Sequence, residues 1–253
     1  HFLEGPVRYL KLRLPAETKR EVYEKVRSSQ LYDSELSMYK VNEPLAKESY
    51  ELGRCRAFTP GWLENESIWL HMEYKYLLEL LKSGLYQQYI GDLYKAAIPF
   101  QDEERYGRSI LENSSFLASS ANPDESIHGR GFVARLSGST VEFMDMWQRM
   151  MFGHTPFREE DDKLVFALQP VIPSYLLDQE RRVEAVFLGK VRIVYHVDAE
   201  DADYIPENYE VVQYCLTGEK DKEIHIYQNQ IMGEEAENIR AGKYTQIEVW
   251  IKK

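Results

Sequence analysis

The stretch Ser137-Gly-Ser-Thr-Val-Glu-Phe-Met-Asp-Met-Trp147 marks a change from loop to helix around which the rest of the chain is organised. Ser139 and Glu142 have the Ser-x-x-Glu spacing of a capping box, in which each side chain bonds the other residue's free backbone N–H. The first turn presents unpaired N–H groups and the positive end of the helix dipole, and Gly138 lets an anion approach closely. The stretch therefore predicts either an ordinary capped helix or a phosphate site at a helix start.

The helix that follows is predicted to bury an apolar stripe and to stop at Gly153. Methionine and tryptophan at helical spacing are typical of core packing rather than of a cofactor site. The predicted buried residues are Val141, Met144, Trp147, Met150 and Met151.

Upstream of this helix the sequence has a helical character. Apolar residues at helical spacing predict an amphipathic helix over 17–27 and two further helices over 67–83 and 86–97. The last two are joined by a short connection, so we expect them to lie antiparallel. Residues 7–14 fit either a strand or a frayed helix end, and residues 101–136 read as a long, partly irregular segment.

After Pro156 the sequence changes to short runs rich in valine, isoleucine and tyrosine, separated by turn residues. Runs of this kind predict strands of an antiparallel sandwich. The expected strands are 164–169, 183–196, 209–216, 223–227 and 246–251, with one short helix over 233–241. The chain is thus predicted to hold two domains, a helical one over 1–155 and a β domain over 156–253.

Charge and composition exclude several functional classes. The formal net charge is −11 and no block of lysine or arginine is present, which disfavours nucleic acid and anionic membranes as partners. Cys55 and Cys215 are not in a metal-ligand spacing, so we predict no metal site and no disulfide. No apolar run is long enough to span a bilayer. Because the chain begins at His1, without a leader pattern, we expect a fragment of a longer protein.

Two polar clusters are candidates for binding. The run Gly61-Trp-Leu-Glu-Asn-Glu-Ser-Ile-Trp-Leu-His71 combines flat apolar rings with carboxylate and amide groups, a mixture that suits a sugar. Its alternative interpretation makes Asn65 a helix cap, the tryptophans core residues and His71 part of a solvent-exposed face. Glu112 and Asn113 fit either ligand contacts or ordinary hydrogen bonds within a loop.

Four motifs occur together in an order that resembles one family. They are Trp62-Leu-Glu-Asn-Glu-Ser-Ile-Trp-Leu-His71, Glu112-Asn-Ser-Ser-Phe, Arg135-Leu-Ser-Gly-Ser-Thr-Val-Glu-Phe and Pro170-Val-Ile-Pro173. From about Tyr39 to its end, the chain resembles the C-terminal part of a glycoside hydrolase family 94 phosphorylase. It is more similar to the β-1,2-oligoglucan phosphorylases than to cellobiose phosphorylase, in which the third motif reads Leu-Thr-Gly-Thr-Ala-Ala-Trp.

The resemblance implies a fold and a reaction. The fold would be the C-terminal part of an (α/α)6 barrel followed by a β-jelly-roll domain, and the reaction an inverting phosphorolysis that releases α-glucose 1-phosphate. Inorganic phosphate would be the co-substrate, with no metal or organic cofactor. By motif, His71 with Ser137, Gly138 and Ser139 would bind phosphate. Glu64 and Asn65 would lie by the acceptor sugar, and Glu112 and Asn113 by the reacting one, although Asn-Ser-Ser stands where the family has Pro-Tyr.

The resemblance also implies partners. The family's general-acid aspartate lies upstream of the histidine motif, so this chain is expected to hold no catalytic acid and to need the N-terminal remainder of its parent protein. A β-linked gluco-oligosaccharide, phosphate and a second copy in a homodimer are the other expected partners, in the cytoplasm. The rival hypothesis is a noncatalytic carbohydrate-binding or scaffold module whose β domain holds the ligand.

Overall fold

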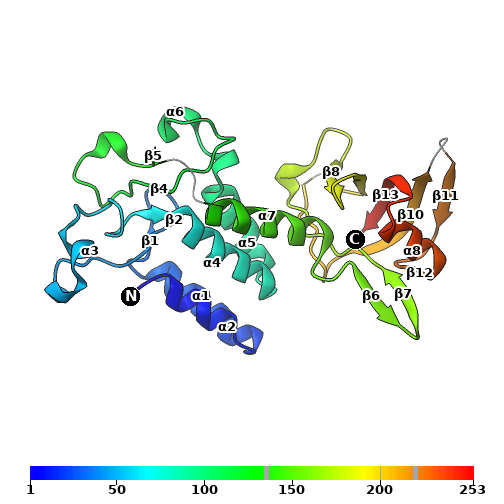
Figure 1. The fold of residues 1–253 in the computed structure, drawn as a ribbon, viewed down its shortest axis with the longest axis horizontal. Helices are drawn as coiled ribbons and strands as arrows, with labels where there is room; N and C mark the ends of the chain where they lie inside the picture. The colour runs from blue at the N-terminus through cyan, green and yellow to red at the C-terminus, as the bar shows by residue number, and fades with distance from the viewer. Residues whose placement is uncertain (134–136, 200, 219–221) are drawn as a thin grey trace. The chain divides into compact units, whose positions relative to one another are not determined.

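The protein is a mixed α and β chain of two compact units, His1–Met146 and Trp147–Lys253 (Figure 1). The computed structural model describes residues 1–133, 137–199, 201–218 and 222–253. The boundary between the units falls within helix α7, and each unit is described separately below. Across the described ranges, every helix is too short or too polar to span a lipid bilayer.

The first unit is built mainly of helices. They are α1 (Glu4–Leu10), α2 (Ala16–Ser28), α3 (Arg54–Ala57), α4 (Leu70–Lys82), α5 (Tyr86–Ala96), α6 (Glu103–Tyr106) and the start of α7 (Ser137–Phe152), with 3₁₀ turns at Tyr50–Leu52, Ile98–Phe100 and Glu125–Ile127. Two small sheets accompany them in the described part of this unit. One pairs β1 (Tyr32–Asp33) with β2 (Met38–Tyr39), and the other has the order β3 (Ile68–Trp69), β4 (Phe116–Leu117), β5 (Gly131–Phe132).

Helix α4 is the centre of the first unit. Its side chains are buried on nearly every face, from Leu70 to Leu81, and it packs against α1 and α5. The predicted helices over 17–27, 67–83 and 86–97 are confirmed as α2, α4 and α5. Helix α4 begins later than predicted because Ile68 and Trp69 pair with β4 as a short strand. The ambiguous segment 7–14 is helical as far as Leu10.

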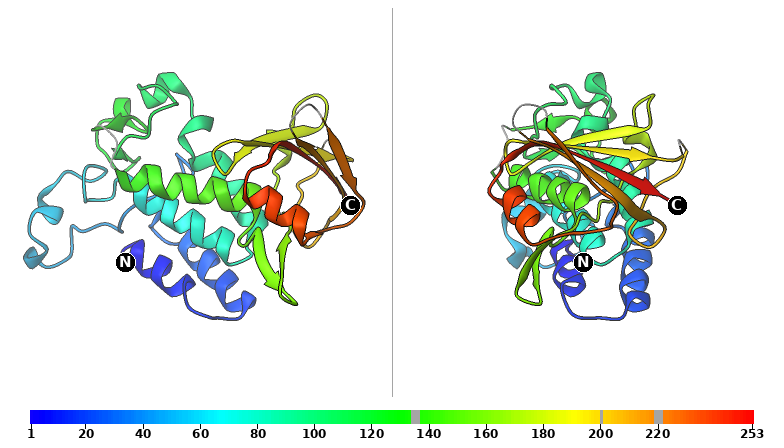
Figure 2. Two further views of the ribbon diagram at one scale, coloured as in Figure 1. Left: turned by 45° about the vertical axis from the view of Figure 1, so that its right-hand side comes forward. Right: turned by 90° about the vertical axis from the view of Figure 1, so that its right-hand side faces the viewer.

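Helix α7 lies alongside α4 (Figures 1 and 2), and ring contact between Tyr74 and Phe143 joins the two. Two details of its prediction were wrong. The helix begins at Ser137, so Ser139 lies inside the first turn and is not the cap. Val141 and Met144 are 62% and 55% exposed. Met150 and Met151 are buried as predicted, and Ser139 and Met146 are the other fully buried positions among the described side chains of the helix.

The described residues of the second unit form two sheets. The larger has the order β11 (Glu223–Ile226), β10 (Glu210–Gly218), β13 (Tyr244–Lys252), β9 (Val191–Val197), β8 (Arg182–Phe187). The smaller has the order β12 (Ile231–Met232), β7 (Lys163–Phe166), β6 (Phe157–Glu160). The 3₁₀ turn Ser174–Leu176 and helix α8 (Glu234–Arg240) complete the unit, and α8 confirms the helix predicted over 233–241.

The expected strands are present, but the pairing is not wholly antiparallel. Strands β9 and β13 are parallel neighbours in the middle of the larger sheet, so the prediction of a purely antiparallel arrangement was wrong. A parallel pair needs a long crossover, and here β10, β11, β12 and α8 supply it. The run 183–196 is a hairpin of β8 and β9 that turns through Gly189, whose φ is +72°.

Alternation along these strands gives the larger sheet one apolar and one polar face. Tyr214 and Val249 are fully buried on the apolar face. Phe166 of the smaller sheet contacts Tyr214 at 6.2 Å between ring centroids and Phe187 at 5.8 Å, so it is part of the same core. The opposite face carries Cys215 and its polar neighbours.

Helix α5 offers a simple test of the assigned helix. Gly91 lies in its exposed interior, and a Cβ there would meet no atom within 4 Å. Because glycine is less favourable than alanine in a helix interior, Gly91→Ala is expected to stabilise the protein by about 1 kcal/mol. Denaturant unfolding followed by circular dichroism measures this difference, and a destabilised variant would contradict the helical assignment.

Candidate functional site

The loop before α4 is held by aromatic packing. Trp62 meets Phe116 and Phe132 edge-on, with centroid distances of 5.1 and 4.5 Å, and Trp69 stacks on Phe116. The indole Nε1–H of Trp69 donates to the carbonyl of Leu63 at 2.7 Å. Both tryptophans therefore help to fix the loop, as the alternative interpretation of this run expects.

His71 lies in the first turn of α4, with its ring perpendicular to that of Trp69 at 5.7 Å. Burial lowers the pKa of the imidazole, and the nearby charge of Lys75 lowers it further, against a smaller opposing effect of Glu4. Within the described part of the chain, the buried Nδ1 atom has no hydrogen-bond partner. His71 is therefore a neutral, half-buried imidazole with unused hydrogen-bonding capacity.

The start of α7 lies directly against this imidazole. A Cβ built on Gly138 would be 3.5 Å from the Cβ and 4.0 Å from the Cγ of His71, both ordinary van der Waals distances, so the first turn of α7 lies beside this histidine. Ser139 is fully buried and makes contacts of its own. Arg135 and Leu136, which open the motif, and the side chain of Ser137 lie outside the described residues. The structure thus brings together two predicted phosphate-binding segments that are far apart in the sequence.

A cavity of about 520 Å³ opens next to His71 and includes Glu64 and Trp69 in its wall. Glu64 accepts a hydrogen bond from Arg54 at 2.7 Å, and both side chains are partly exposed. An opening of this size, with a carboxylate and an imidazole in its wall, can hold a small polar ligand.

The remaining predicted residues have structural partners. Asn65 is buried, and its Nδ2 donates to the carbonyl of Phe58 at 2.7 Å. Glu112 accepts from Arg108 at 2.7 Å. Asn113 accepts from the hydroxyl of Tyr74 at 2.8 Å, and Tyr74 lies on α4 three residues after His71. Asn113 therefore lies beside α4, next to Glu112 in the chain. Asn65 instead faces the interior of its own loop.

Sequence reasoning missed two groups with chemical potential. Glu73 is a fully buried carboxyl in the core, on α4 two residues after His71. Cys215, Glu223 and His225 meet on the polar face of the larger sheet, although their spacing in the sequence matches no common metal motif. Alternation places Glu223 and His225 on one face of a strand, but the approach of Cys215 depends on strand pairing.

Comparison with known proteins does not identify a family for this chain. No protein-family model matches the chain, and no curated protein matches it either. The case for a function therefore depends on the motifs in the sequence and on the geometry around His71.

Proposed function

We propose that this chain is the C-terminal part of an inverting glycoside phosphorylase that cleaves β-linked gluco-oligosaccharides with inorganic phosphate. The observation that carries the proposal is the proximity of Gly138, in the first turn of α7, to His71: a Cβ built on Gly138 would be 3.5 Å from the His71 Cβ. The resemblance of the motifs to family 94 supplies the reaction. On this proposal the first unit belongs to an (α/α)6 barrel and the second is a jelly-roll domain.

The local chemistry suits phosphate. Free N–H groups in the first turn of a helix and the helix dipole favour an anion, and Gly138 admits it without steric hindrance. The neutral imidazole of His71 can donate one hydrogen bond without a counter-ion. A bound phosphate would raise the lowered pKa of the ring, because a nearby negative charge favours the protonated form. Phosphate binding would then favour the protonated imidazole of His71, and the two would form an ion pair.

The reaction requires one further group. A phosphate oxygen would attack the anomeric carbon as the glycosidic C–O bond breaks, and the departing sugar oxygen would take a proton from an aspartic acid. The family resemblance places that acid upstream of the present residues. Glu64, in the cavity beside His71, would accept hydrogen bonds from the acceptor sugar's hydroxyl groups.

The proposal is tested with the parent protein, acting on β-1,2-linked gluco-oligosaccharides, by measuring the phosphate-dependent release of glucose 1-phosphate. His71→Ala is expected to raise the KM for phosphate at least tenfold, since it removes a donor from the anion site, while the sugar KM changes little. The matched control is His154→Ala, which removes an exposed histidine of the second unit. The 253 residues alone are expected to show no turnover.

Two results would reject the proposal. Absence of phosphorolysis by the parent protein would contradict the reaction, and an unchanged phosphate KM in His71→Ala would contradict the anion site. A second candidate, the noncatalytic sugar-binding module, is favoured by Trp250, which stacks on His196 at 4.8 Å with an interplanar angle of 8°. Sugar bound by the second unit without phosphorolysis would support that candidate.

A further inference from the structure

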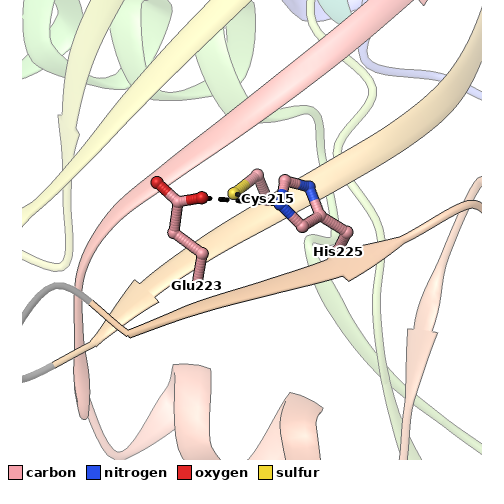
Figure 3. A group of neighbouring side chains, drawn as sticks. All are labelled: Cys215, Glu223 and His225. Carbon is pink, nitrogen blue, oxygen red and sulfur yellow. Dashed lines mark hydrogen bonds and ion pairs between the residues drawn. The ribbon is translucent and has the colours of Figure 1, made fainter.

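The pairing of β10 with β11 brings three potential metal ligands to one face of the larger sheet. Cys215 lies directly opposite His225 in the antiparallel register, and Glu223 precedes His225 by two residues on the same face of β11. Figure 3 shows the three side chains converging from the two strands. Their nearest ligand atoms all lie within 4.8 Å of one another.

The distances are close to those of a zinc site. The Sγ of Cys215 is 4.0 Å from the Nε2 of His225, and that nitrogen is 3.5 Å from a carboxylate oxygen of Glu223. Zinc bonds of about 2.3 Å to sulfur and about 2.0–2.2 Å to nitrogen and oxygen, in a tetrahedron, separate such ligands by roughly 3.5 Å. Small rotations of exposed side chains are enough to close the remaining gap.

The neighbour of the imidazole can select the correct tautomer. Gln213 lies one alternation away from Cys215 on β10, and its amide nitrogen Nε2 is 3.3 Å from the Nδ1 of His225, so a half-turn of the amide group would bring its oxygen to that position. With its amide oxygen turned to the ring, Gln213 would accept a hydrogen bond from Nδ1–H. The Nε2 lone pair would then point toward Cys215 and Glu223, which is the arrangement that metal-binding histidines use.

The charges around Cys215 also favour a cation. The carboxylates of Glu223 and Glu248 flank the Cys215 thiol, Glu223 from β11 and Glu248 from the position opposite Cys215 on β13. A divalent cation is attracted by both carboxylates and stabilises the thiolate. Glu248 accepts a hydrogen bond from His196 at 3.0 Å, so it serves as a neighbouring charge and leaves the fourth ligand position open.

We propose that Cys215, Glu223 and His225 form a zinc site with three protein ligands and one open position. A thiolate and an imidazole favour zinc over magnesium or calcium, which prefer oxygen ligands. The thiol proton of Cys215 is released to solvent as the Zn–S bond forms. Glu223 and His225 are 57% and 45% exposed, so the ion can enter directly from solvent. The site lies wholly within the second unit and is independent of the proposed phosphorolysis.

Titration of the reduced 253-residue chain with Zn²⁺ in competition with a chromophoric chelator tests the proposal. We expect one equivalent to bind, and Cys215→Ser and His225→Gln each to weaken binding at least tenfold. Cobalt(II) in place of zinc is expected to give a thiolate-to-metal absorption band in the unaltered chain. The band reports the Co–S bond directly, so it remains informative even if a variant fails to fold.

Two matched variants act as controls. Cys55→Ser removes the other cysteine, and His196→Gln removes another histidine from the same sheet face, so both are expected to retain the affinity and the cobalt band. Stoichiometric binding that survives Cys215→Ser, a cobalt complex without a thiolate band, or no binding at micromolar zinc would each overturn the proposal.

Discussion

Gly61→Ala is expected to destabilise the protein by about 3 kcal/mol, because two unfavourable effects coincide. Gly61 has a φ of +74°, in the left-handed region that side chains rarely adopt. A Cβ there would also lie 2.5 Å from the backbone nitrogen of Asn122 and 2.9 Å from its Cα. These are backbone atoms, and the loop around them is fixed by the hydrogen bond from Ser119 N–H to the Gly61 carbonyl at 3.2 Å.

Gly84→Ala separates these two effects. Gly84 has the same φ of +74°, but a Cβ there would meet nothing within 4 Å. This control is expected to lose only about 1 kcal/mol, the contribution of backbone strain. Equilibrium unfolding in denaturant measures both variants. Equal losses of stability in the two variants would show that the close approach of Gly61 to Asn122 adds no steric penalty.

Glu73→Gln is expected to remove a pronounced decline of stability with rising pH. Burial raises the pKa of the Glu73 carboxyl well above 4.5, the backbone N–H of Tyr39 opposes this shift, and Asp92 and Asp33 add to it. One carboxyl oxygen accepts that N–H at 2.8 Å, whereas the other is buried without a partner in the described part of the chain. Glutamine keeps the accepting oxygen but cannot ionise.

The direction in which stability changes with pH follows from the protons bound by the folded and unfolded states. Below pH 4.5 the carboxyl is protonated in both states; above it the unfolded chain loses the proton while the folded chain keeps it. Stability therefore falls as pH rises from 4.5 to the raised folded pKa, by at most about 1.4 kcal/mol per pH unit. The stability difference between Glu73→Gln and the unaltered protein should grow across that window and then stay constant.

Urea unfolding at a series of pH values measures this difference. The control is Glu4→Gln, because the hydrogen bond from Arg8 lowers the pKa of the Glu4 carboxyl and gives a pH dependence of opposite sign. Parallel pH profiles for Glu73→Gln and the unaltered protein would mean that Glu73 ionises normally in the folded state.

Local periodicity predicted much of the secondary structure because it records which side of each element is buried. Helices α2, α4 and α5 and most strands of the second unit follow from apolar spacing alone. The buried side of α7 followed only in part: Met150 and Met151 are buried as predicted, but the apolar residues Val141 and Met144 are exposed. Which apolar row is covered depends on tertiary packing.

Long-range pairing was less accessible to sequence reasoning. The parallel neighbours β9 and β13 are separated by several elements, and no local pattern specifies that they meet. The same limit applied to Cys215 and His225, whose proximity depends on the register of one hairpin. By contrast, the sequence motifs alone predict that His71 and Gly138 belong to one site, and a Cβ built on Gly138 would be 3.5 Å from the Cβ of His71.

The position of β11 at the end of the larger sheet has a consequence for the solution behaviour of the protein. A terminal strand leaves one row of backbone donors and acceptors free, and such rows invite pairing with strands of other molecules. The alternation of Glu223 and His225 puts charged and polar groups beside this row, which disfavours the approach of a second chain. Replacement of Glu223 and His225 by apolar residues is therefore expected to promote self-association.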